Sequence, residues 1–258
     1  MKADYAKRGY HYVKNYGLSK LYLKAKERLE RDILERDYQQ WMISERPADS
    51  EKELQREHHF AYAPRISVVV PVYKTPEAFL REMVDSVLNQ TYGNVELCLA
   101  DGSEEDHGPQ KILEAYAAQD PRIRYEKLPK NLGIAGNTNA ALDLATGEYV
   151  ALLDHDDFLE EHALFELVKW LQTHPEADMI YTDEDKVSFD SATFFQPHFK
   201  PDFNPDLLRT NNYICHFLMV KRTLMEQAGK YRESFDGAQD YDFILRCSEL
   251  AQEIDHIP

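Results

Sequence analysis

The sequence contains little cysteine. Its three cysteines, Cys98, Cys215 and Cys247, are odd in number and far apart in a chain of 258 residues. This spacing excludes a disulfide framework and offers no zinc-ligand pattern. Each cysteine lies in an apolar stretch, so we expect buried thiols in a protein of a reducing compartment.

Long apolar runs are also absent. No stretch approaches the roughly 20 apolar residues that a transmembrane helix needs, and residues 1–5 lack the apolar core of a signal peptide. We therefore expect a cytoplasmic protein without a membrane span. Contact with the inner face of the cell membrane stays compatible with these absences.

Positive charge is scarce. The 30 lysines and arginines face 46 aspartates and glutamates, so the net charge is −16, which argues against a nucleic-acid partner. The same charge would repel an anionic substrate unless a bound cation compensated for it locally. Hydrophobic residues make up 43% of the chain, including 16 Tyr and 12 Phe, which is enough for a sizeable core.

Residues 1–62 are expected to form a helical N-terminal segment. Apolar side chains recur there at helical spacing, with lysines and arginines on the remaining surface. The apolar positions are Leu18, Leu21, Tyr22, Ala25, Leu29 and Ile33. Such a helix could lie on an anionic membrane surface, dock a partner, or pack on its own catalytic domain. A break at 46–50 and a connector to residue 59 follow.

From residue 63 to 258 the pattern alternates between strands and helices. Strands are expected at 66–70, 95–100, 123–125, 149–153, 178–181 and 213–220. Helices are expected at 76–88, 112–118, 131–147, from 158 to 171 and at 237–250, with a loop-like stretch at 188–209. Thr75 and Pro76 are expected at the N-cap and first position of the first helix. Repeated units of this length predict an α/β fold with a mostly parallel, twisted sheet covered by helices on both faces.

An acidic motif follows the strand at 149–153. In an extended segment Asp154 and Asp156 would point to the same side. Two such carboxylates favour a hard divalent cation, Mg²⁺ or Mn²⁺, with substrate phosphates completing its shell. The alternative is an acidic turn in which Asp157 caps the following helix.

Other strands of the predicted sheet also end in polar residues. Tyr73 follows the first strand, Asp101 the second and Asp183 the fifth. The carboxyl ends of parallel strands lie side by side, so these residues are expected to converge with Asp154 on one crevice.

The ordered motifs resemble a known family. They are Val-Val-Val-Pro-Val-Tyr at 68–73, Asp-Gly-Ser at 101–103, Asn-Leu-Gly at 131–133, Asp-His-Asp-Asp at 154–157 and Gln-Asp-Tyr-Asp at 239–242. Their order and spacing resemble those of family-2 glycosyltransferases with the GT-A fold, over about residues 64–258. The N-terminal segment is similar to the helical leader of bacterial members that build rhamnan or O-antigen chains.

This resemblance implies roles for individual residues. Those implied to bind a nucleotide-diphospho-sugar are Pro71, Val72, Tyr73, Asp101, Asn131, Gly133, Asn139 and Asp154. Asp154 and Asp156 would hold the divalent cation, and Asp240 would be the general base for a hydroxyl of a saccharide or lipid-linked acceptor. The donor would be UDP- or dTDP-linked, and the reaction would be an inverting transfer in polysaccharide biosynthesis. The oligomeric state stays open.

Further residues are candidates for contacts with acceptor or phosphate. They are Asp183, Asp185, Lys186, His216 and Gln239. A solvated turn would equally explain the first three, and His216 could be a core histidine with a backbone partner. Asp240 itself could be an ordinary acid at a helix start.

Two features depart from the family pattern. Gln239 stands where the family usually has Glu, and members tend to continue past residue 258 with a short strand carrying a metal-binding His. We therefore expect a C-terminally truncated domain, and whether His256 substitutes stays open. A non-catalytic nucleotide-sugar-binding or scaffold module is the alternative function. A sugar-phosphate nucleotidylyltransferase is disfavoured because residues 71–76 form no glycine-rich, arginine-containing loop.

Overall fold

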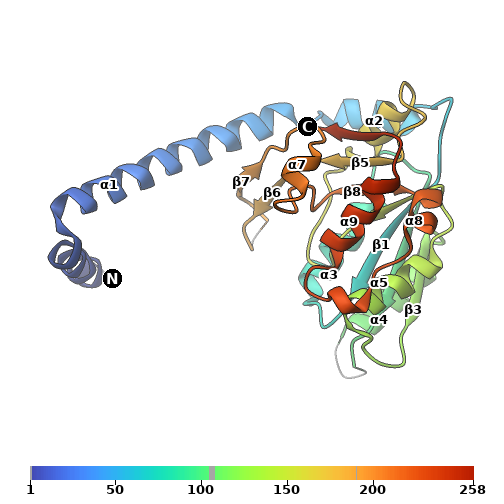
Figure 1. Ribbon diagram of the computed structural model, residues 1–258, viewed down its shortest axis with the longest axis horizontal. Coiled ribbons are helices and arrows are strands. Elements are labelled where there is room, and N and C mark those ends of the chain that lie inside the picture. Colours follow the sequence, from blue (N-terminus) through green and yellow to red (C-terminus); the bar gives the residue numbers. More distant parts are fainter. Residues whose placement is uncertain (1, 105–107, 190) are drawn as a thin grey trace. The chain divides into compact units, whose positions relative to one another are not determined.

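The computed structural model describes residues 2–104, 108–189 and 191–258 (Figure 1). The chain divides into two compact units. The larger comprises Pro47–Glu184 and Phe199–Pro258, and the smaller comprises Met1–Arg46 and Asp185–His198. The boundary therefore lies at Pro47 rather than at residue 62, because α2 (Asp49–Glu57) joins the larger unit, where the Thr91 hydroxyl donates to the Gln55 side chain at 2.8 Å. The segment expected as a connector is thus helical.

The larger unit is built on a seven-stranded sheet with the order β3-β2-β1-β4-β8-β5-β9. The strands are β1 (Ile66–Val72), β2 (Val95–Asp101), β3 (Ile123–Lys127), β4 (Tyr149–Leu152), β5 (Met179–Thr182), β8 (Leu218–Lys221) and β9 (Ile254–Ile257). Only β8 runs antiparallel to its neighbours among these described strands. The prediction of a mostly parallel sheet is confirmed.

Helices cover both faces of this sheet, as expected (Figure 1). One face carries α3 (Glu77–Leu88), α4 (Pro109–Gln119) and α6 (Ala163–Leu171), and the other carries α5 (Gly133–Leu144), α8 (Arg222–Ala228) and α9 (Gln239–Leu250). Successive residues of β1 serve the two cores in turn. Val68 and Val70 pack toward the first group of helices and Val69 toward the second, as the period of a strand requires.

Two local expectations at the first strand are wrong. β1 continues through Pro71 to Val72, and proline is tolerated there because β4 pairs with β1 only as far as Val69. Helix α3 begins at Glu77 with Pro76 in the N-cap place, and Thr75 makes no capping hydrogen bond.

The structure contains short helices and strands in places where the sequence predicts either no element or a longer one. The stretch 188–209 contains β7 (Phe194–His198) and α7 (Pro205–Leu208), β6 (Glu184–Val187) pairs with β7, and the 3₁₀ turn η1 (Glu233–Phe235) precedes α9. Strand β8 is only four residues long, and β9 follows α9. Four residues carry too little periodicity to reveal a strand.

The smaller unit combines α1 (Lys2–Glu45) with the β6–β7 hairpin. Gly17, at φ 83°, interrupts the helical backbone of α1. Near its carboxyl end, the Tyr38 hydroxyl donates to Asp185 at 2.6 Å and the Arg46 guanidinium lies 4.5 Å from the Phe194 ring centre. The predicted apolar stripe stays exposed: Leu18, Tyr22 and Leu29 keep 72%, 69% and 61% of their surface. None of the helices in the described ranges is apolar and long enough to span a bilayer.

A buried carboxylate lies at the amino ends of the central strands. Glu96 of β2 is fully buried and accepts hydrogen bonds from the Ser67 hydroxyl at 2.6 Å and the Thr146 N–H at 2.6 Å. Arg124 and Arg65 lie 2.9 and 3.3 Å from it. Burial acts to raise the pKa of Glu96, but these hydrogen bonds outweigh it and hold the pKa below its usual value.

Replacing Glu96 by Ala should lower the free energy of unfolding by about 3 kcal/mol, because two arginines and two buried donors lose their acceptor. Urea denaturation at pH 7 measures this. Glu126→Ala, an exposed position on β3, is the matched control. A lowered pKa stabilises the fold above the unfolded pKa, so the difference between wild type and Glu96→Ala should shrink as the pH falls. A loss below about 1 kcal/mol, the size of one ordinary hydrogen bond, would contradict the assigned role.

Candidate active site

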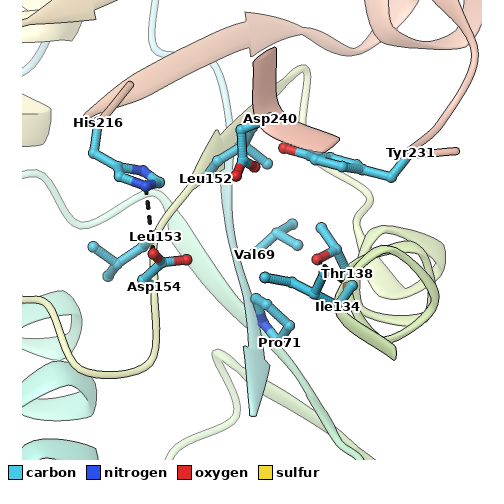
Figure 2. Close-up of a pocket in the computed structure, with 10 residues that line it drawn as sticks. All are labelled: Val69, Pro71, Ile134, Thr138, Leu152, Leu153, Asp154, His216, Tyr231 and Asp240. Carbon is cyan, nitrogen blue, oxygen red and sulfur yellow. Dashed lines mark hydrogen bonds and ion pairs between the residues drawn. The ribbon is translucent and has the colours of Figure 1, made fainter. Parts of the chain in front are cut away.

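A pocket lies at the carboxyl ends of β1 and β4 (Figure 2). Its lining residues are Val69, Pro71, Ile134, Thr138, Leu152, Leu153, Asp154, His216, Tyr231 and Asp240. Four of these, Pro71, Asp154, His216 and Asp240, are among the residues singled out from the sequence. The carboxyl edge of the sheet is where open α/β folds bind ligands.

Asp154 and His216 form an ion pair on one side of this pocket. Their Oδ2 and Nε2 atoms are 3.4 Å apart (Figure 2). The bond from His216 holds the pKa of Asp154 below its usual value. Burial acts to lower the pKa of His216, but the bond to Asp154 outweighs it and raises that pKa to about 11. The pairing with Asp154 therefore favours the imidazolium form of His216.

The acidic motif forms a turn, not a strand extension. β4 ends at Leu152, and the Asp157 N–H donates to the Asp154 carbonyl at 3.3 Å. The expectation that Asp154 and Asp156 share one side is therefore wrong, because strand alternation does not apply within a turn. Asp156 is exposed, 3.8 Å from His155. Asp157 does not cap α6, which begins only at Ala163.

Asp157, rather than Asp156, lies close to Asp154. One ligand atom each of Asp154, Asp157 and His216 lies within 4.8 Å of the others, the one such group of three found among residues 2–104, 108–189 and 191–258. Burial, together with the neighbouring Asp154, raises the pKa of Asp157, as expected where carboxylates approach each other. Oxygen donors of this kind fit Mg²⁺ or Mn²⁺. The two carboxylates of this group are the oxygen donors that fit, and His216 pairs with one of them.

Asp240 lies in the first turn of α9, as expected. The Gln239 side-chain amide donates to its Oδ2 at 2.7 Å. Burial raises the pKa of Asp240, His216 acts to lower it and Asp154 adds to the rise. Asp242, two residues on, is held by Arg232 and Arg246, so its carboxylate is already engaged.

The residues expected around the nucleotide base are placed differently. Pro71 lines the pocket, but Val72 is fully buried in the core on the α3 face, and Tyr73 is half-buried. Asp101 is also fully buried, accepting the Ser103 N–H at 2.8 Å and the Tyr125 hydroxyl at 3.2 Å.

The segment 131–139 leads into α5 and forms its first half. Asn131 accepts the Gly133 N–H at 3.0 Å through its Oδ1. Gly133 has φ +78°, and a Cβ there would lie 2.9 Å from an Asp236 carboxylate oxygen, so glycine is required. Asn139 bonds the backbone of Tyr231.

The remaining candidates do not line the pocket. Asp183 accepts the Lys200 N–H at 2.7 Å and lies 2.8 Å from His256 on β9, so His256 is not in the group with Asp154. Asp185 and Lys186 belong to β6 in the smaller unit, where Lys186 bonds Gln196 at 3.1 Å.

Tyr231 was missed by sequence reasoning. It looks like an ordinary core aromatic, and no motif or spacing marks it. Its place beside Asp240 depends on the fold around η1 and α9, which a sequence pattern does not encode.

Comparisons with known proteins agree with this fold and show its family. A family model described as glycosyl transferase family 2 matches residues 67–229. An uncharacterised protein, y4gI, of Sinorhizobium fredii is 48% identical over 75% of this chain and 22% of its own length. The O-antigen biosynthesis protein RfbC of Myxococcus xanthus is 37% identical over 86% of this chain and 17% of its own length. The chain thus spans about a fifth of the length of these relatives.

Solved structures show the same fold. S. aureus TarS, in complex with UDP, aligns with a TM-score of 0.62 at 22% identity, over 75% of this chain and 57% of that one. The mannosyltransferase PcManGT from Pyrobaculum calidifontis, with GDP-Man and Mn²⁺, aligns with a TM-score of 0.57 at 20% identity, over 80% of this chain and 60% of that one. Since the family model covers well over half of the chain, the chain belongs to glycosyl transferase family 2.

Proposed function

We propose that this chain is the transferring module of a protein in polysaccharide assembly. It moves a sugar from a nucleoside-diphosphate donor to a hydroxyl of a saccharide or lipid-linked acceptor, with inversion at the anomeric carbon. The observation that carries the proposal is the convergence of Asp154, His216 and Asp240 on one pocket at the carboxyl edge of the sheet. The role of the Myxococcus relative in O-antigen biosynthesis supports the pathway class.

The proposed chemistry divides the pocket into two sides. Asp240 accepts the proton of the acceptor hydroxyl as that oxygen attacks the anomeric carbon. On the other side, the His216 imidazolium provides positive charge near the departing diphosphate. Its pairing with Asp154 orients the ring toward the pocket. Gln239 fixes one oxygen of the base.

A divalent cation is proposed at the acidic turn, held by Asp154 with a second carboxylate. Family resemblance assigns that second carboxylate to Asp156, whereas Asp157 lies nearer Asp154 in the structure. Asp156 is exposed and lies 3.8 Å from His155. When bound, the ion would act as a Lewis acid that neutralises charge on the leaving group. Mn²⁺ in the Pyrobaculum mannosyltransferase supports this assignment.

The donor is proposed to be UDP- or dTDP-linked. A carboxylate such as Asp101, if a rearrangement frees it from Ser103 and Tyr125, suits a donor-rich base or ribose. The UDP bound to TarS, which shares this fold, supports the uridine alternative.

The exposed stripe of α1 is proposed to contact the inner face of the cell membrane, with the chain on the cytoplasmic side. Leu18, Tyr22 and Leu29 provide the apolar surface, and nearby lysines would face anionic lipid.

A thermal-shift screen of UDP- and dTDP-sugars, with and without Mn²⁺, tests the function. A true donor at about 100 times its Kd should stabilise the fold by about 2.7 kcal/mol, and Mn²⁺ should enlarge the shift. Glu126→Ala, on exposed surface of β3, should respond like wild type, whereas Asp154→Ala should lose the Mn²⁺-dependent part. Absence of stabilisation by every nucleotide sugar would refute the proposal. Stabilisation without transfer to any acceptor would point to a binding module.

A further inference from the structure

Tyr231 is held from two sides. Its ring is 5% exposed and stacks on Phe243 of α9, with ring centres 4.8 Å apart and planes at 13°. Its backbone is bound by a single side chain of α5. The Asn139 amide donates to the Tyr231 carbonyl at 2.9 Å and accepts the Tyr231 N–H at 2.9 Å. The residue is therefore fixed to α9 through its ring and to α5 through its backbone.

The free end of this fixed side chain points at Asp240. In Figure 2 the Tyr231 hydroxyl extends into the pocket toward the Asp240 carboxylate. The second neighbour of that carboxylate is the Gln239 amide, at 2.7 Å from Oδ2. Asp240 is thus placed between a phenol from the η1 side and an amide from its own helix.

Tyr231 engages both ends of the Asn139 side-chain amide. Its Nδ2 donates to the Tyr231 carbonyl and its Oδ1 accepts the Tyr231 N–H, so both ends of the amide are held by one residue. Asn139 therefore acts on the pocket through Tyr231, in contrast to the direct donor contact that family resemblance implies.

We propose that Tyr231 is a positioning residue for Asp240, and that Asn139 fixes Tyr231 in the place from which it acts. This inference rests on the proposed function, in which Asp240 is the base. A hydroxyl that donates to the ionised carboxylate favours that form and fixes the direction of its free oxygen. Burial keeps Tyr231 itself protonated, because it raises the pKa of the phenol well above its ordinary value.

Tyr231→Phe tests this, since it deletes one oxygen and keeps the stacked ring. We expect kcat to fall about 10-fold or more, the usual value of a hydrogen bond to a charged group, with the donor KM unchanged. The rising limb of kcat against pH should move to higher pH, because the hydroxyl that favours the ionised carboxylate is lost. The other groups that face Asp240, namely Asp154, His216 and Gln239, stay in place. Tyr116→Phe, which deletes a 2.8 Å bond to Asp85 between α3 and α4, is the matched control and should change neither value.

Asn139→Ala separates positioning from donor binding. A lower kcat at constant donor KM agrees with the proposal, whereas a higher donor KM at constant kcat would overturn the role given to Asn139. Wild-type kcat and pH profile in Tyr231→Phe would overturn the role of Tyr231.

A measurement independent of turnover keeps this inference distinct from the proposed function. Carboxyl ¹³C NMR of aspartate-labelled protein, with the Asp240 signal assigned through Asp240→Asn, should show a higher Asp240 pKa in Tyr231→Phe than in wild type. If the wild type transfers no sugar, the proposed function fails while this comparison still decides the contact. An unchanged titration would overturn the inference.

Discussion

Replacing Asp240 by Asn should reduce sugar transfer by about 10² to 10⁴-fold, the range expected for loss of a general base. The amide has the size of the carboxylate but does not accept the proton of the acceptor hydroxyl. Donor binding should persist, because the residues proposed to hold the diphosphate stay in place. Steady-state transfer to a soluble acceptor, together with donor binding by calorimetry, measures both quantities.

Glu249→Gln is the matched control, since it makes the same chemical change at an exposed position of α9. The wild type should also show a rising limb of kcat with pH. Burial raises the pKa of Asp240, so ionisation of the base, and with it transfer, should be lost as the pH falls through that raised pKa. Full activity in Asp240→Asn, or a rate that rises toward acid pH, would remove Asp240 from the role of base.

The sheet and the edge that holds the site could be predicted because their signals are local. The β-branched run of β1 and the apolar run of β4 each end in polar residues. The rule for parallel strands then brings those ends together. Asp154 was found in this way, whereas Asp240, in the first turn of α9, was singled out only through the family resemblance.

The contacts inside the site could not be predicted because their partners are distant in sequence. His216 meets Asp154 only because β8 inserts antiparallel between β4 and β5, and four residues of β8 do not reveal that pairing. Tyr231 lies in a loop, and Asn139 of α5 holds that loop by a hydrogen bond to the Tyr231 carbonyl. The extended conformation predicted for the acidic motif is wrong, because the chain forms a turn directly after Leu153.

Replacing Asp154 by Ala should abolish the Mn²⁺ dependence of donor binding and lower transfer at least about 100-fold, since a Lewis acid contributes several kcal/mol to such a step. Asp154 is the one carboxylate common to both assignments of the metal site, by family resemblance and by its proximity to Asp157. It also orients His216, which would lose its ion-pair partner. Calorimetric titration of Mn²⁺ into donor-saturated protein measures the first effect.

Asp156→Asn and Asp157→Asn, each compared with wild type, identify the second metal ligand. Asp156 and Asp157 are both exposed, but only Asp157 has a carboxylate oxygen within 4.8 Å of a ligand atom of Asp154 and of His216. Burial and the neighbouring Asp154 raise the pKa of Asp157, and metal binding competes with protonation of its ligands, so Asp156→Asn should weaken Mn²⁺ binding more than Asp157→Asn. The opposite order would assign the ion to the three-residue group seen in the structure. Unchanged Mn²⁺ binding in both variants and in Asp154→Ala would place the cation elsewhere and leave His216 as the local positive charge for the diphosphate.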